Sequence, residues 1–370
     1  MIKETELAQE LKKSATTILS STGFIEIVER ISDYPDWAQI RDEKAVDFSI
    51  QVETKEQKKY WLLFEVKSVG QPKYARMAVE KLRSFLSYGE NVYCFFGAPS
   101  IFKESQEICQ KNGIGYLDLA GNCLFKFDNI YISIQGRPSL YPTTRPLRSL
   151  FAPAASRGLR ALFLDPKREW LVRDFAKEAG ISIGQASNVK RRLLDFEFVK
   201  ETGVVIKKGK KFRLANPISL LEKWTANYTY SKNTVRNYYS FEGVSTIENN
   251  LAGFLSANNI PYAFALTSGA SFAAPFLRYN RVFVYVKDRI EDIVNALKLK
   301  EVSSGANVSL LEPYDIGVFY GQQEFYRKDQ VQGFKVVSDI QLYLDLKSYK
   351  ERGEEAAEFI LNQRLKKQWS

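Results

Sequence analysis

Apolar and polar residues follow two periods in the first third of this 370-residue chain. Helical spacing covers residues 4–31, and the alternation over 46–52 places Asp47, Ser49 and Gln51 on one side of a strand. The pattern then predicts a strand over 61–67, a helix over 74–88, a strand over 92–96, a helix over 101–110, a strand over 114–119 and a hairpin over 123–127 and 130–134. This order predicts an α/β sandwich over residues 1–136.

A different pattern occupies the middle of the chain. Residues 137–154 contain four prolines and no apolar period, which predicts a stiff, extended linker. In residues 155–216, helical spacing over 157–164 and 169–179 stops at Gly180, and Ser182 is placed to cap a third helix. Two short strands, 204–206 and 212–214, flank a lysine-rich turn. This segment predicts a helix-turn-helix followed by a β-hairpin wing.

Residues 217–370 predict a second α/β domain. Strand patterns at 235–241, 262–266, 281–286, 308–311, 316–320 and 335–337 alternate with helical patterns near 246–258, 289–299, 339–347 and 353–366. The chain as a whole is therefore expected to be a multidomain protein of α/β and α+β class.

Composition excludes several classes of protein. No apolar run reaches 18 residues, and Met1–Glu10 is polar and charged, so we expect a cytoplasmic protein without a membrane segment. Three widely spaced cysteines favour reduced, mostly buried thiols. The chain has no histidine, which excludes Ser-His-Asp triads, Cys-His pairs and His-ligated zinc. Any catalysis would rely on carboxylates, lysine, tyrosine or Mg²⁺ or Mn²⁺ held by oxygen ligands.

The net charge of +10 is concentrated in one segment. Fifteen Lys/Arg and seven Asp/Glu lie between Arg157 and Arg213, and Arg137, Arg145 and Arg148 precede them. The flanking parts of the chain are together nearly neutral. This asymmetry is typical of a nucleic-acid-binding module between two neutral domains.

The third helix of the basic segment carries polar groups suited to base recognition. Ala186, Val189 and Leu193 share its apolar face. The candidate DNA-binding residues on the helix and wing are Gln185, Ser187, Asn188, Lys190, Arg191, Arg192, Lys207, Lys208, Lys210 and Lys211. Amides can pair with adenine, guanidinium with guanine, and wing lysines with phosphates. Residues 155–216 thus resemble winged helix-turn-helix DNA-binding domains; a basic surface on an interaction bundle is the alternative.

Asp47, Glu65 and Lys67 are the candidate catalytic residues of the first domain. Glu65 and Lys67 project from one face of an apolar strand, beside the strand that Asp47 begins. They resemble the triad of the PD-(D/E)XK nuclease superfamily, a restriction-endonuclease-like fold. That resemblance implies that Asp47 and Glu65 hold Mg²⁺ or Mn²⁺ while Lys67 acts on water, with Glu26 or Glu29 as an additional acid. The alternatives are a solvated structural ion pair and a nuclease fold used only for binding.

A turn-forming segment, Gly113–Asn122, follows in the same domain. Gly121 and Asn122 permit a tight turn into the hairpin, with Asp118 at the end of the preceding strand. Turn chemistry is the simpler interpretation. The alternative places Asp118 and Asn122 in a cleft shared with Glu65.

The C-terminal domain resembles a minimal nucleotidyltransferase fold in Thr267–Ser271 and the strand Arg281–Val286. Because that strand lacks paired carboxylates and Asp288 lies beyond its end, we expect no transferase activity. Together with the winged helix and the segments Asp339–Leu346 and Glu354–Glu358, residues 155–370 resemble AbiEi-type antitoxins of type IV toxin-antitoxin systems.

The sequence therefore predicts a sequence-specific regulator of double-stranded DNA, the antitoxin or repressor of a type IV toxin-antitoxin or phage-defence operon. That family implies a cognate toxin as a partner, and a homodimer is left open. The alternative function is a magnesium-dependent DNA endonuclease targeted by its winged helix.

Overall fold

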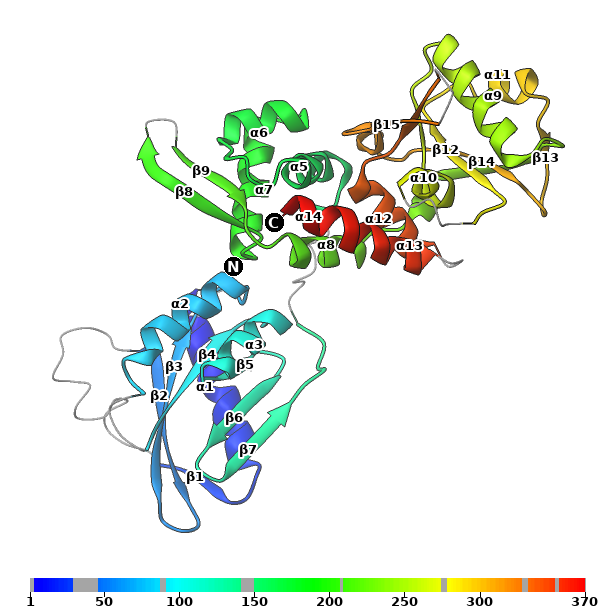
Figure 1. The fold of residues 1–370 in the computed structure, drawn as a ribbon. Helices are drawn as coiled ribbons and strands as arrows, with labels where there is room; N and C mark the ends of the chain where they lie inside the picture. Colours follow the sequence, from blue (N-terminus) through cyan, green and yellow to red (C-terminus); the bar gives the residue numbers. More distant parts are fainter. Residues whose placement is uncertain are drawn as a thin grey trace. The chain divides into compact units, whose positions relative to one another are not determined.

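A computed structural model describes residues 3–28, 46–86, 91–140, 150–206, 209–273, 278–327, 332–349 and 353–369 (Figure 1). The chain forms two compact units, residues 1–146 with 194–197 and residues 147–193 with 198–370. Each unit contains a seven-stranded sheet, and the chain is a multidomain mixed α/β protein, as the sequence predicts.

In the first unit, the strands are paired in chain order. They are β1 (Ile25–Ile27), β2 (Phe48–Thr54), β3 (Lys59–Val66), β4 (Val92–Ala98), β5 (Gly115–Asp118), β6 (Cys123–Phe127) and β7 (Ile130–Ile134). The central pairs β3–β4 and β4–β5 are parallel, and the other pairs are antiparallel. The crossovers between the parallel strands contain α2 (Pro72–Arg83) and α3 (Lys103–Lys111).

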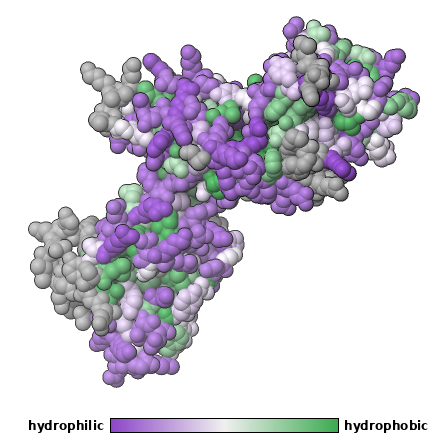
Figure 2. Space-filling model, in the orientation of Figure 1, coloured by the Kyte–Doolittle hydropathy of each residue, from purple (hydrophilic) through white to green (hydrophobic). Residues whose placement is uncertain are grey.

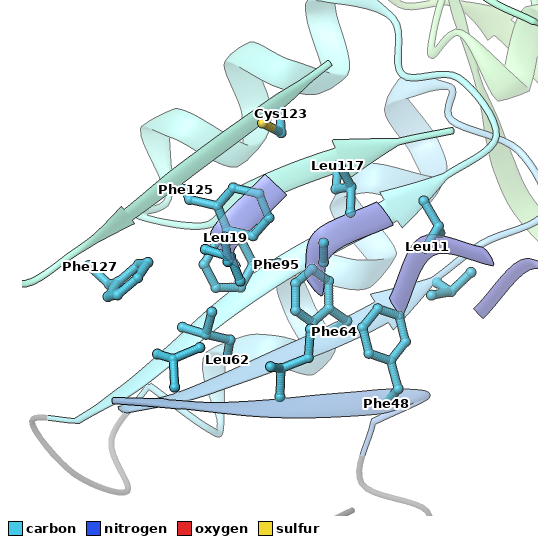
Figure 3. Packing of buried hydrophobic residues seen from close by; sticks show 14 of the residues in the cluster. Leu11, Leu19, Phe48, Leu62, Phe64, Phe95, Leu117, Cys123, Phe125 and Phe127 are labelled. Atoms are coloured by element: carbon cyan, nitrogen blue, oxygen red, sulfur yellow. The ribbon is translucent and has the colours of Figure 1, made fainter. Parts of the chain in front are cut away.

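Helices cover both faces of this sheet, which makes the predicted α/β sandwich. On one face, α1 (Glu4–Ser20) packs Leu11 and Leu19 onto aromatic residues of the strands (Figure 3). The ring of Phe64 stacks on Phe48 at 4.4 Å and on Phe95 at 4.9 Å. On the other face, residues of α2 and α3 form a second buried cluster with the strands. Burial of these apolar surfaces is the main force that holds the unit together.

Three details of the first unit differ from the sequence prediction. The helix expected to reach residue 31 ends at Ser20, because Gly23 adopts a left-handed φ of 72° and β1 begins at Ile25. Glu26 therefore lies on a strand, and Glu29 lies outside the described residues. The polar side of β2 is also buried, since Ser49 and Gln51 are covered on the second face of the sheet.

The second unit begins with three helices and a two-stranded sheet. They are α5 (Pro153–Leu164), α6 (Val172–Ala179), α7 (Ile183–Asp195), β8 (Val199–Ile206) and β9 (Gly209–Leu214). Gly180 ends α6 with a left-handed φ of 61°, as its position in the sequence predicts. An aromatic core of Trp170, Phe175 and Phe212 joins the helices to the hairpin, and Trp170 bridges to Phe212 through the main chain. Both hairpin strands are longer than predicted.

The remaining residues of this unit build the second sheet. Its strands are β10 (Thr234–Tyr239), β11 (Tyr262–Phe264), β12 (Val282–Val286), β13 (Lys300–Glu301), β14 (Val308–Glu312), β15 (Gln323–Tyr326) and β16 (Gly333–Val336). They follow the spatial order β13-β10-β14-β12-β11-β16-β15, which mixes parallel and antiparallel pairs. The sheet is therefore built from pairings between distant parts of the chain.

Helices and helical turns surround this sheet. They are α8 (Pro217–Thr225), η2 (Tyr230–Lys232), α9 (Val244–Ala257), α10 (Leu266–Ala273), α11 (Ile290–Ala296), η3 (Ile316–Phe319), α12 (Asp339–Ser348), α13 (Gly353–Ile360), the π-helical turn η4 (Leu361–Leu365) and α14 (Lys366–Trp369). Two predictions were wrong here. In place of the strand predicted over 316–320 there is a 3₁₀ turn, η3, opened by the Asp315 side chain. Thr267–Ser271 lies inside α10, not before it.

Candidate functional site

Glu65 is the buried centre of a charged cluster in the first unit. Its side chain is 1% exposed, and its two carboxylate oxygens accept hydrogen bonds from two ammonium groups. Lys67 Nζ donates to Oε1 at 2.5 Å, as the shared strand face predicts, and Lys81 Nζ donates to Oε2 at 2.6 Å. Burial of a carboxylate is tolerated when it is paired in this way. The sequence reasoning missed Lys81, although it flanks the apolar stripe of the predicted α2.

The environment of Lys67 stabilises its charged form. Partial burial lowers the pKa of this lysine, but the hydrogen bond and negative charge of Glu65 outweigh that effect, and the pKa is raised. Asp47 adds to the same electrostatic field. The exposed Asp47 lies just before β2, where its main-chain N–H bonds to Phe64 O at 3.0 Å. Its carboxylate accepts the N–H of Val66 at 2.7 Å.

These contacts test whether a divalent cation fits the arrangement. Mg²⁺ and Mn²⁺ need carboxylate oxygens that point at the ion without competing cations. Here both oxygens of Glu65 bind ammonium groups, and Oδ2 of Asp47 binds a main-chain N–H. Over the described ranges, no group of three or more Cys, Asp or Glu residues is placed to hold a metal ion. As arranged, Asp47, Glu65 and Lys67 do not fit a divalent ion.

Asp118 and Asn122 form a turn. Asp118 Oδ1 accepts the Asn122 main-chain N–H at 2.9 Å, and its Oδ2 accepts the Asn122 amide at 3.0 Å. Burial raises the pKa of Asp118. Asn122 also exchanges two hydrogen bonds with the main chain of Arg137. The side chains of both residues are therefore used in the turn, as the simpler interpretation predicts.

Helix α7 presents a polar face to solvent. Ala186, Val189 and Leu193 are buried, as their spacing predicts. The exposed residues on the other sides include Gln185, Ser187, Asn188 and Arg191. In the view of Figure 2, hydrophilic residues dominate the surface over this part of the second unit. Four of the predicted helix residues are thus accessible to a ligand.

Two of the predicted helix residues have additional structural roles. Gln185 and Ser182 form a capping box, in which Ser182 Oγ accepts the Gln185 N–H at 3.2 Å and Gln185 Oε1 accepts the Ser182 N–H at 3.0 Å. Lys190 is turned toward the hairpin, where it donates to Glu201 at 2.8 Å and to Lys210 O at 3.2 Å. The hydrogen bond from Lys190 lowers the pKa of Glu201. Lys190 therefore fixes the helix to the hairpin.

The hairpin carries the other predicted cations. Lys210 and Lys211 are exposed on β9, and they pair with Glu201 and Glu169 at 3.5 Å, respectively. Such exposed pairs are weak and can exchange for phosphate contacts. Arg192 is half-buried. Lys207 and Lys208 lie outside the described residues.

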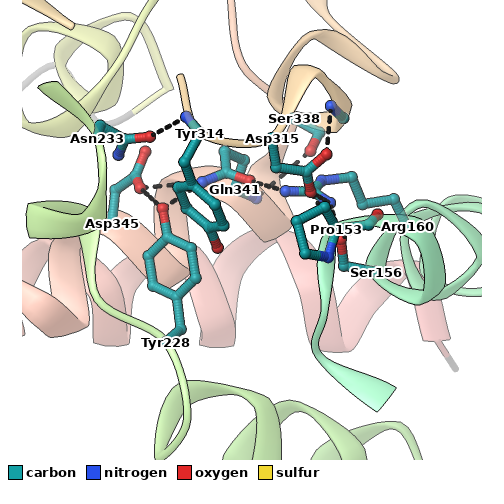
Figure 4. Close-up of polar contacts among 11 residues, drawn as sticks. Pro153, Ser156, Arg160, Tyr228, Asn233, Tyr314, Asp315, Ser338, Gln341 and Asp345 are labelled. Carbon is teal, nitrogen blue, oxygen red and sulfur yellow. Dashed lines mark hydrogen bonds and ion pairs between the residues drawn. The ribbon is translucent and has the colours of Figure 1, made fainter. Parts of the chain in front are cut away.

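A buried polar network in the second unit was not found from the sequence (Figure 4). Arg160 of α5 is 1% exposed and donates to Asp315 and Ser156 at 3.0 Å each and to Gln341 of α12 at 2.7 Å. Its guanidinium lies 5.2 Å from the centre of the Trp224 ring. The sequence signal that could have indicated this network is an arginine within the apolar run of α5, because a buried arginine needs polar partners. The network ties α5 to η3, which lies between β14 and β15, and to α12, which follows β16.

Asp345 lies at the other end of this network. Its Oδ1 accepts from Tyr228 at 2.5 Å, Tyr285 at 3.0 Å and Gln341 at 2.9 Å, whereas its Oδ2 has no hydrogen-bond partner. Burial raises the pKa of Asp345 to about 6.

The three cysteines of the first unit are buried thiols, as predicted, and burial raises their pKa values.

Comparisons with known proteins cover only parts of the chain. No curated protein matches the chain. Two solved structures are similar, "Structure of EndoMS in apo form" at 19% identity and "crystal structure of a repair endonuclease from Pyrococcus abyssi" at 16%. Each similarity covers 29% of this chain with a TM-score of 0.18. The chain spans 45% and 46% of those two proteins, less than half of each.

One family matches the C-terminal part of the chain. Residues 213–366 match the family described as "Transcriptional regulator, AbiEi antitoxin, Type IV TA system". The match begins on β9 and covers the second sheet with the helices around it. Within the described ranges, no helix is long and apolar enough to cross a membrane. The resemblance to AbiEi-type regulators is therefore confirmed over residues 213–366.

Proposed function

We propose that the chain is a sequence-specific DNA-binding transcriptional regulator, the antitoxin or repressor of a type IV toxin-antitoxin or phage-defence operon. The exposed polar face of α7 beside the lysine-bearing hairpin is the observation that carries this proposal. In this proposal, α5–α7 with β8–β9 act as a winged helix-turn-helix, and α7 enters the major groove of double-stranded DNA. The matched regulator family supports the same function.

The proposal assigns distinct tasks to the polar residues. Asn188 and Arg191 are assigned to base edges, since both are exposed on α7, where Arg191 donates to Asn188 Oδ1 at 3.3 Å. Lys207, Lys208, Lys210 and Lys211 are assigned to phosphates, which fix orientation and affinity but carry no sequence information. The domain built around the second sheet is proposed to be nucleotidyltransferase-like, without transferase activity. The proposed protein partner is a cognate toxin.

Salt dependence tests the hairpin assignment. Replacing Lys207, Lys208, Lys210 and Lys211 by alanine should weaken binding to all duplexes and reduce the slope of log K against log salt by up to about 0.9 per lost contact. The double variant Lys210→Ala/Lys211→Ala has a matched control, Lys366→Ala/Lys367→Ala. The control removes the same charge from the exposed side of α14. Fluorescence anisotropy with a random duplex gives both slopes. If the hairpin variants keep the wild-type slope, the hairpin does not contact phosphate.

Base readout needs a duplex selected for tight binding. Asn188→Ala and Arg191→Ala should each cost roughly 1–3 kcal/mol on that duplex and leave random DNA nearly unaffected. Gln185→Glu keeps the acceptor of the capping box but removes the amide donor that adenine requires. This variant therefore separates base reading from helix capping. Equal losses on selected and random DNA would assign these residues to phosphates.

The second candidate is a magnesium-dependent endonuclease, which the grouping of Asp47, Glu65 and Lys67 at the ends of neighbouring strands favours. In this alternative, a nuclease-like first domain is delivered to its site by the winged helix. Mg²⁺ or Mn²⁺ would supply the activation of water, but the contacts of Glu65 do not fit such an ion. Plasmid nicking in either metal, lost in Lys67→Ala, would establish the activity; intact plasmid would contradict the endonuclease and leave a structural ion pair or a nuclease fold used only for binding.

A further inference from the structure

Lys81 is an unexpected member of the charged cluster around Glu65. It lies on α2, where Ala78, Val79 and Leu82 are buried against the sheet, so position 81 lies at the edge of the packed face. From there its side chain, 41% exposed, extends to Oε2 of Glu65 at 2.6 Å. The alkyl stem of a lysine allows the charged end to reach inward while part of the chain stays in solvent.

The charges around Glu65 are balanced without any bound ion. A carboxylate that is 1% exposed needs positive charge close by, and the ammonium groups of Lys67 and Lys81 provide it on separate oxygens. Two ammonium groups carry the same charge as one divalent cation. A metal approaching Oε2 would have to displace the ammonium of Lys81, which already binds this oxygen at 2.6 Å.

We propose that Lys81 is a built-in cation that takes the place of a divalent metal ion at Glu65. The first unit then keeps a buried carboxylate and works without Mg²⁺ or Mn²⁺. Removing only the charge of Lys81 should expose Oε2 and allow Glu65 and the nearby Asp47 to bind a divalent ion. The proposal concerns the first unit and is independent of DNA binding by α7 and the hairpin.

Four full-length proteins test this idea: wild type, Lys81→Met, Lys81→Arg and the double variant Lys81→Met/Glu65→Gln. Methionine keeps the unbranched stem and removes the charge, whereas arginine keeps the charge. Titration calorimetry with MnCl₂ and MgCl₂ should detect no millimolar binding by wild type or Lys81→Arg. Lys81→Met should bind Mn²⁺ at least about tenfold more tightly than the weakest binding that the calorimetry detects, and its melting temperature should rise with added metal.

The double variant should lose both the binding and the thermal shift, which assigns the new site to Glu65. Wild-type binding of Mn²⁺ as tight as that of Lys81→Met would overturn the proposal. A folded Lys81→Met protein that gains no metal affinity would overturn it as well, since Lys81 would then be only an ion-pair partner. If Lys81→Met does not fold, Lys81→Gln retains a hydrogen-bond donor without charge and gives the same readout.

Discussion

Glu65 and Asp345 are both buried carboxylates, but the two units stabilise them differently. Glu65 accepts from two ammonium groups, one just after its own strand and one on the next helix. Asp345 accepts at one oxygen from two tyrosine hydroxyls and an amide, and its other oxygen has no partner. Cationic partners compensate a negative charge directly, whereas neutral donors compensate it only in part. Burial therefore raises the pKa of Asp345 to about 6.

The two clusters also differ in how far apart their members lie in the sequence. Glu65 and Lys67 are two residues apart, and Lys81 follows sixteen residues after Glu65. Tyr228 and Tyr285 precede Asp345 by 117 and 60 residues. The first cluster forms with local structure, and the second requires the complete second unit. Loss of a partner should cost most in the second unit, at the Arg160–Asp315 ion pair of the same network, because both of its side chains are fully buried.

The largest effect is expected for Arg160→Met. Asp315 would keep only the donors from Ser156 and Gly317 while remaining buried, and Gln341 would lose its guanidinium partner. Breaking a buried ion pair from one side typically costs 3–5 kcal/mol, so we expect a loss of about that size in the free energy of unfolding. Urea titration followed by tryptophan fluorescence measures it. Arg173→Met, at an exposed position of α6, should change it by less than about 0.5 kcal/mol.

Asp345→Asn should have the next largest effect, and its sign depends on pH. The native pKa of Asp345, about 6, lies above the ordinary value of 3.8, so the folded protein favours the protonated acid. The protonated carboxyl of Asp345 therefore makes its full contribution to the free energy of unfolding below pH 3.8. This contribution is lost as the pH rises through about 6. Asparagine stays neutral. Its stability relative to wild type should therefore increase between pH 4 and pH 7, by up to about 3 kcal/mol at about 1.4 kcal/mol per pKa unit.

Melting temperatures of both proteins at several pH values between 4 and 7.5 give this difference. The exposed Asp288→Asn serves as the matched control and should show no such trend. A difference between Asp345→Asn and wild type that stays constant with pH would mean that Asp345 does not change protonation in this range.

The same contrast explains which parts of the fold could be predicted from the sequence. Strands β2–β7 have clear apolar periods and pair in chain order, so the α/β sandwich could be predicted. Gly180 and Ser182 marked the helix ends because their chemistry is local. The order of the second sheet depends on strand pairings up to 78 residues apart, such as Thr234 with Glu312. The contacts of Arg160 with Asp315 and Gln341 span 155 and 181 residues. Periodicity encodes neither. Lys81 was missed because charged residues beside a helical stripe are usually solvated.

The smallest of the three effects is expected for Lys67→Met. This lysine is 24% exposed, and Glu65 would retain the ammonium group of Lys81, so the remaining charge is still partly compensated. A charge-assisted hydrogen bond to a buried group contributes roughly 1.5–3 kcal/mol, and we expect a loss of about 2 kcal/mol in urea unfolding. Lys103→Met, at an exposed position of α3, should leave the free energy of unfolding nearly unchanged.

If Lys67→Met instead cost as much as Arg160→Met, the two ammonium groups would act as one unit. The contrast between a locally built and a globally built cluster would then fail. Adding Lys81→Met to Lys67→Met separates these cases, because a coupled pair gives a strongly non-additive loss and independent partners give the sum of the single losses.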